Sequence, residues 1–172
     1  MESRVKFLGH PIHPMLIVFP LGLLATAVIF DIIALARDVP FLFSVSFWMI
    51  AAGVLGGLIA AVFGLIDWLA IPAHTRAKRV GLWHGIGNAI VTVFFAASWV
   101  LRRATSDRPS ATALTLSFVA VVIALISAWL GGELVDRLGV GVDDGANLNA
   151  TNSLSGRPAA PQNRDSGLRR VA

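Results

Sequence analysis

The chain has 172 residues, of which 56% are hydrophobic and only 14% charged, with a mean hydropathy of +0.75. A soluble domain carries about 25% charged residues, so this composition excludes a water-covered globule and favours the bilayer as solvent. The sequence contains no cysteine or tyrosine, which excludes disulfides, thiolate metal sites and tyrosyl chemistry, and the +4 charge lies in short links and a tail, which excludes a nucleic-acid-binding face.

Four intervals are long enough to cross a membrane. A hydrocarbon core about 30 Å thick needs roughly 20 apolar residues in a helix, and each run should be helical because lipid cannot satisfy a free backbone group. The intervals are Met15 to Ala36, interrupted by Asp31, and those between Asp38 and Asp67, Arg79 and Arg102, and Arg108 and Glu133. Short polar links make sequential helices antiparallel. We therefore predict an all-α fold, an integral membrane bundle of four antiparallel transmembrane helices.

The flanking sequences divide the chain into three parts: an N-terminal segment (1–13), the four-helix transmembrane domain (14–138) and a disordered C-terminal tail (139–172). Pro14 suits the first turn of a helix. A residue before proline is pushed towards extended backbone, so we expect His10 and His13 to be extended, with His13 as the N-cap. After Gly139 the sequence is rich in Gly, Asn, Ser, Asp and Pro, a composition that cannot offset the entropy of ordering.

The basic residues near the spans predict the orientation in the membrane. The side that holds the N-terminus, the second link and the tail has about six Lys and Arg residues close to the spans, against four on the other side, Arg37, Arg102, Arg103 and Arg108. Both termini are therefore expected in the cytoplasm.

Polar residues at the edge of a span are costly and are functional candidates by default. In this chain they gather towards the expected cytoplasmic end, where they comprise His10, His13, Asp67, His84, Asn88 and Glu133. Asp31 stands apart, near the opposite end of the first span. We expect the gathered residues to form the functional site.

Three interpretations of this cluster are open. In the first, His13 and His84 from the diagonal first and third helices ligate a haem b, with Asn88 and His10 near the cofactor. In the second, a non-haem metal is held by His10, His13 and His84 with a carboxylate from Asp67 or Glu133. In the third, the chain is a structural or accessory membrane subunit without cofactor, and the cluster ties helix ends together.

Several motifs resemble one family. They are GHPIHPMLIVFPLGL at 9–23, GLID followed by Trp68 at 64–68, GLWHGIGN at 81–88 and GGELVDRLGVGV at 131–142. Across about residues 7 to 142 the chain is similar to the bacterial membrane family called domain of unknown function 2231. The resemblance singles out His10, His13, Asp67, His84, Asn88 and Glu133 in this sequence.

The resemblance implies a location in the bacterial inner membrane and, because relatives are fused to Rieske or cytochrome-c-like domains and are likened to membrane b-type cytochromes, a redox role. The chain differs from two-haem membrane cytochromes because all four of its histidines lie towards one side, so at most one haem is expected. Besides the bilayer, a redox partner protein and a homo-oligomer are candidate partners, whereas nucleic acid is not. No hydrolase or transferase motif is present, and electron transfer is the enzymatic activity left open.

Overall fold

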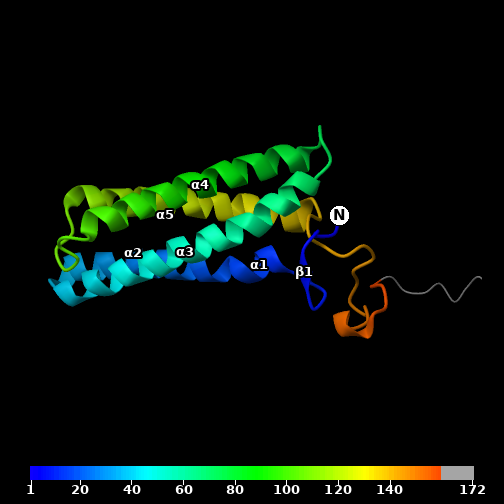
Figure 1. Cartoon of the computed structure of the whole chain (residues 1–172), viewed down its shortest axis with the longest axis horizontal. Coiled ribbons are helices and arrows are strands. Elements are labelled where there is room, and N and C mark those ends of the chain that lie inside the picture. The colour runs from blue at the N-terminus through cyan, green and yellow to red at the C-terminus, as the bar shows by residue number, and fades with distance from the viewer. Residues whose placement is uncertain (160–172) are drawn as a thin grey trace, which may run out of the picture.

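The structure is a computed structural model and describes residues 1–159. The first span consists of α1 (Ile12–Leu16) and α2 (Val18–Arg37), and the later spans are α3 (Pro40–Ala70), α4 (Arg76–Arg102) and α5 (Ala111–Gly132), which continues as the π-helical turn η1 (Glu133–Arg137). Successive spans run in opposite directions along one long axis (Figure 1). The predicted bundle of four antiparallel membrane helices is confirmed.

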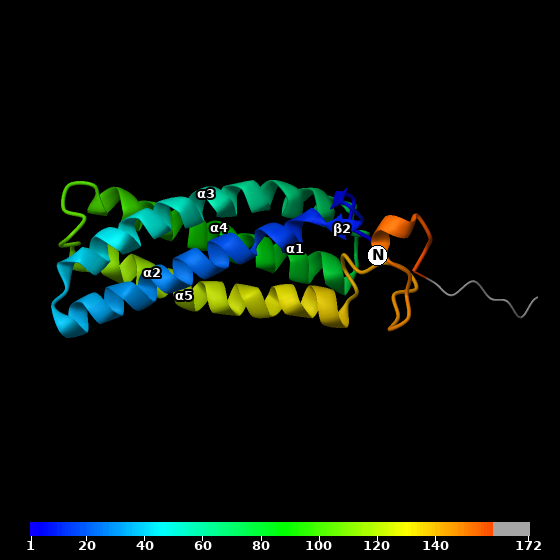
Figure 2. The same cartoon turned by 90° about the horizontal axis from the view of Figure 1, so that it is seen from below.

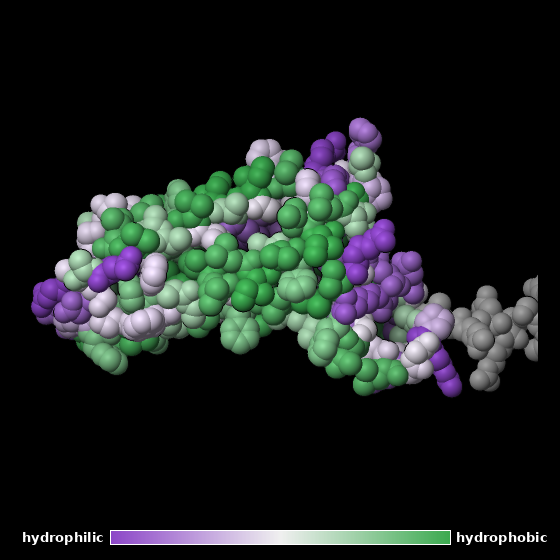
Figure 3. Space-filling model, in the orientation of Figure 1, coloured by the Kyte–Doolittle hydropathy of each residue, from purple (hydrophilic) through white to green (hydrophobic). Residues whose placement is uncertain are grey.

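The spans are long enough for a bilayer and present apolar side chains outwards. They contain 26, 31, 27 and 27 residues, and at about 1.5 Å per residue even the shortest is about 39 Å long. Hydrophilic side chains gather at the two ends of the bundle, while the surface between them is largely hydrophobic (Figure 3). A surface of this kind is stable against lipid, so the chain is a membrane protein in contact with the bilayer.

The bundle is built from two helical hairpins, the first formed by α1, α2 and α3 and the second by α4 and α5, which meet mainly along α3 and α4. The second view shows the same arrangement from below (Figure 2). The buried core between the hairpins includes Leu24, Ile50, Phe95 and Ala120. Gly53 allows the close approach of α3 to α2, because a Cβ at this position would lie 2.7 Å from the Leu24 side chain. This is the tight packing that small residues permit in lipid.

The N-terminal segment contains a small hairpin that the sequence did not predict, formed by β1 (Lys6–Phe7) and β2 (His10–Pro11). Its two-residue loop has positive φ at both positions, 51° at Leu8 and 83° at Gly9, which is the geometry that matches strand twist. His10 is extended, as expected. His13 is not the N-cap: α1 begins at Ile12, whose N–H donates to the Val5 carbonyl at 3.1 Å, and Pro14 is accommodated in the first turn.

Residues 139–159 return across the N-terminal segment at the same end of the bundle (Figure 2). The Met1 ammonium donates to the Gly139 carbonyl at 3.1 Å, and the Gly141 N–H donates to the Met1 carbonyl at 2.9 Å. A short 3-10 helix, η2 (Ser153–Ser155), follows. The remaining residues of the predicted disordered tail, 160–172, lie outside the described residues, and the predicted division of the chain stays a prediction.

Candidate functional site

His13 and His84 meet inside the bundle, one from each hairpin. Their ring centroids are 6.4 Å apart and the ring planes are perpendicular. His13 lies in α1 and His84 in α4, and both side chains are half-buried. Of the residues named from the sequence, these two and Asn88 are the ones that the fold brings together.

Each imidazole is oriented by a backbone carbonyl of the other helix in its own hairpin. His13 Nδ1 lies 2.9 Å from the Ala60 carbonyl oxygen, and His84 Nδ1 lies 2.8 Å from that of Ser127. Because a carbonyl only accepts, Nδ1 carries the proton, and in the neutral ring the lone pair is on Nε2. An Nδ1–H bonded to a backbone carbonyl is the usual support of a histidine that ligates a metal through Nε2.

Two glycines make room for the two rings. A Cβ at Gly64 would lie 2.7 Å from His13 Cε1, and a Cβ at Gly131 would lie 3.1 Å from His84 Cε1. Each glycine lies one helical turn after the residue that supplies the carbonyl: Gly64 after Ala60, and Gly131 after Ser127. The carbonyl sets the direction of the ring, and the glycine lets the ring approach the neighbouring helix closely.

Asn88 occupies the remaining nitrogen of His84. Its Nδ2 lies 3.0 Å from His84 Nε2, one turn along α4, as the sequence spacing predicts. The Asn88 side chain is exposed. A ligand at His84 Nε2 therefore requires Asn88 to turn away, and its exposed position leaves space for that rotation.

The other candidate residues serve different contacts. His10 Nε2 lies 3.3 Å from the Ser153 hydroxyl. Asp67 accepts hydrogen bonds from the Ser3 hydroxyl at 2.8 and 2.9 Å and from the Arg4 N–H at 2.9 Å, which anchors the N-terminal segment. Glu133 pairs with Arg76 at 2.6 Å. The five-residue metal set is not assembled, and within residues 1–159 no three His, Cys, Asp or Glu side chains form a group that could hold a metal ion.

A buried ion pair lies towards the opposite end of the bundle. Arg102 Nη1 and Nη2 donate to the two carboxylate oxygens of Asp31 at 2.9 and 2.6 Å, and neither side chain is exposed. The guanidinium also donates to the hydroxyls of Ser98 and Ser117 at 3.1 and 3.2 Å. The count of basic residues placed Arg102 at the membrane surface, which is wrong: it is the last residue of α4 and is buried because Asp31 faces it at the same depth.

The two hairpins repeat one pattern, which is the signal that sequence analysis missed. His13 and His84 are 71 residues apart, as are Asp31 and Arg102. The two carbonyl residues, Ala60 and Ser127, and the two glycines beside the rings are each 67 apart.

A serine contact shows the same correspondence. Ser46 donates to the Ala27 carbonyl at 2.8 Å in the first hairpin, and Ser98 donates to the Ala113 carbonyl at 2.7 Å in the second. The donor lies on the later helix of the first hairpin and on the earlier helix of the second. Each hairpin therefore contributes one imidazole and one charged group to contacts across the bundle.

The spacing of the two imidazoles is compatible with both rings holding one metal ion. With metal–nitrogen bonds of about 2.0 Å and ring centres about 1.1 Å behind each nitrogen, two opposed imidazoles have centres about 6.2 Å apart. The observed 6.4 Å is close to this value. The donor set of two imidazoles, each with its Nδ1–H bonded to a carbonyl, therefore fits a centre that both histidines would hold.

No curated protein and no solved structure matches the chain. A family model described as predicted membrane protein (DUF2231) matches residues 9–144, which include every helix of the bundle and both histidines. With most of its length matched and its four apolar helices in place, the chain belongs to the DUF2231 family of predicted membrane proteins.

Proposed function

We propose that this protein is a small redox-associated membrane protein in which His13 and His84 hold one haem b between the two hairpins. The observation that carries the proposal is the convergence of two imidazoles at 6.4 Å, each with its Nδ1 directed at a backbone carbonyl. When bound, the haem would supply one-electron transfer, with a potential set by its axial ligands and their hydrogen bonds. The activity would then be electron transfer to or from a redox partner protein.

The chain's own groups would control both ligands. The Ala60 and Ser127 carbonyls would hold each ring in the tautomer that leaves Nε2 free for the haem. The Asn88 amide would compete with the haem for His84 Nε2. Once turned away, this amide would be available for hydrogen bonding at the edge of the site.

The proposed location is the bacterial inner membrane with both termini in the cytoplasm. The burial of Arg102 against Asp31 supports this orientation. It leaves Arg37, Arg103 and Arg108 as the basic residues of the opposite side, which strengthens the bias of Lys and Arg towards the terminal side.

Two reporters fused in turn after the last residue test this orientation. A fluorescent protein that matures only in the cytoplasm should be bright, and alkaline phosphatase, which needs disulfides formed outside the cytoplasm, should be inactive. The reverse pair of results would refute the orientation.

The test of the cofactor is spectroscopic. The full chain is purified in mild detergent from a haem-replete host, and its reduced-minus-oxidised spectrum is recorded beside metal analysis. We expect a shifted Soret band that His13→Ala and His84→Ala abolish. The matched control is His74→Asn, because His74 lies in the link at φ 64°, a conformation that Asn tolerates. A spectrum that survives both His13→Ala and His84→Ala would refute the assigned ligands.

A structural or accessory role is the second candidate. It is favoured by the same hydrogen bonds: both rings already bond to neighbouring helices, and Asn88 already satisfies His84 Nε2. A colourless, metal-free protein in which His13→Ala lowers thermal stability would establish this role. Stoichiometric zinc, iron or manganese in a colourless protein would instead favour the non-haem interpretation.

A further inference from the structure

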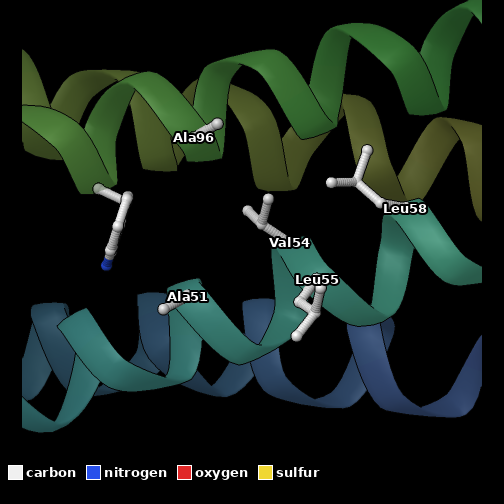
Figure 4. Close-up of a pocket in the computed structure, with 6 residues that line it drawn as sticks. Ala51, Val54, Leu55, Leu58 and Ala96 are labelled. Carbon is white, nitrogen blue, oxygen red and sulfur yellow. The ribbon is translucent and has the colours of Figure 1, made fainter.

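A lipid-facing pocket lies between α3 and α4, away from the histidines. Its volume is about 180 Å³, and it is lined by Ala51, Val54, Leu55, Leu58, Ala96 and Trp99. In Figure 4 the Val54 and Leu58 side chains project from α3 towards α4, which carries Ala96, while Ala51 and Leu55 lie along α3. The walls are almost entirely apolar, so the pocket suits a hydrocarbon chain.

One polar group interrupts these apolar walls. The Trp99 indole N–H is buried and has no hydrogen-bond partner among residues 1–159. The ring of Phe47 stacks on that of Trp99, with centroids 5.5 Å apart and planes inclined by 22°, which holds the indole in place. An unsatisfied donor is costly in hydrocarbon. An occupant that satisfies this donor must bring an acceptor oxygen to Trp99 Nε1, and because the nitrogen is buried the lining side chains must part to admit it.

A cation lies just beyond this donor. The Arg103 guanidinium carbon is 5.9 Å from the Trp99 ring centroid, and the side chain is exposed at the end of α4. Its neighbour Arg102 is paired with Asp31, whereas Arg103 has no ion-pair partner among residues 1–159. Its position after the last residue of the span places it at the level of the lipid headgroups.

We propose that this groove is a binding site for an anionic phospholipid. The phosphate lies against Arg103, an ester carbonyl accepts the Trp99 N–H, and an acyl chain runs along α3 from Ala51 towards Leu58. A cation, a donor and an apolar groove thus follow one another from the headgroup level inwards, in the order in which a phospholipid presents phosphate, ester and chain. Trp99 is 15 residues from His84 along α4, about 22 Å at 1.5 Å per residue, so this site is independent of the histidine pair.

The test measures lipid binding to the full chain in detergent by native mass spectrometry. Phosphatidylglycerol and phosphatidylcholine with identical acyl chains are titrated separately. Loss of one hydrogen bond corresponds to about fivefold weaker binding, so Trp99→Phe should weaken both lipids by about that factor while keeping an aromatic ring to stack on Phe47. Arg103→Gln should remove the preference for phosphatidylglycerol. The matched control is Trp129→Phe, which changes an exposed indole on α5.

A second variant keeps the donor and fills the groove. Ala51→Leu should weaken the binding of both lipids, although this variant retains the Trp99 donor and the Arg103 cation. Equal lipid binding by Trp99→Phe and Trp129→Phe, or an unchanged phosphatidylglycerol preference in Arg103→Gln, would overturn the proposal. So would extraction of a bound lipoquinone in place of phospholipid. Circular dichroism of each variant separates weaker binding from loss of the fold.

Discussion

The buried pair of Asp31 and Arg102 makes the sharpest prediction about stability. Arg102→Met removes four hydrogen bonds, two to the carboxylate and one each to Ser98 and Ser117. If these bonds were only polar glue at about 0.6 kcal/mol each, the loss would be about 2.4 kcal/mol. However, the substitution also leaves a fully buried carboxylate without its countercharge, which costs about 3–5 kcal/mol. We expect the larger value.

The measurement is the free energy of unfolding in mixed micelles with increasing denaturing detergent. It is made for Arg102→Met, Asp31→Leu and the double variant, because a double-mutant cycle isolates the interaction of two groups in contact. The double variant should be more stable than either single variant, since it leaves no unpaired charge in the apolar bundle. A loss below about 2 kcal/mol in Arg102→Met, or single-variant effects that simply add, would refute the reasoning.

Three further predictions test other parts of the molecule. Gly64→Ala should displace the His13 ring, because the new Cβ would lie 2.7 Å from its Cε1. Gly85→Ala should change neither the thermal stability nor any cofactor spectrum, because a Cβ there has no neighbour within 4 Å in the described part of the chain. Ser98→Ala should cost more stability than Ser46→Ala, at about 0.6 kcal/mol per lost bond. The Ser98 hydroxyl also contacts Arg102 and Ser117, whereas among residues 1–159 the Ser46 hydroxyl bonds only to the Ala27 carbonyl. Equal losses of stability would contradict this prediction. Hydrogen bonds from the Lys6 ammonium and then from the Asp144 N–H lower the pKa of Glu2 below its ordinary 4.5, so their contribution is present above that value and is lost as pH falls through the lowered pKa. The Asp144 amide should then lose protection in hydrogen exchange as pH falls from about 6 to about 3, and Glu2→Gln should show no such change.

The fold follows from the sequence because the bilayer imposes one simple condition. Each interval without charge that exceeds the hydrocarbon thickness must be a helix, since lipid offers no other partner for the backbone. This condition located all four spans to within a few residues. It did not locate the small hairpin of β1 and β2, which depends on the positive φ values of Leu8 and Gly9 rather than on hydropathy.

Arg102 shows where reasoning from charge alone fails. It is followed by Arg103 and a polar link, so a count of charges assigns both residues to the membrane surface. The tertiary structure separates them: Arg103 is exposed, while Arg102 is buried against Asp31. Two charges so far apart in the chain attract each other only after the hairpins pack together. No local sequence pattern indicates that the two residues lie at the same depth in the membrane. The 71-residue spacing shared with the histidines is the signal that could have revealed the pair.

The candidate site was likewise predicted in part from the sequence and decided in part by the tertiary structure. Residue type and position along each span determined by themselves that His13, His84 and Asn88 lie towards one end of the bundle, because hydropathy sets the depth of a residue in a membrane helix. Only the tertiary structure decided that the two imidazoles lie close together, and that Asp67 and Glu133 bond to Ser3 and Arg76 instead of to a shared centre. The direction of a side chain around its helix axis depends on which helices pack together, and for His13 and His84 it was set by the Ala60 and Ser127 carbonyls and the glycines beside them.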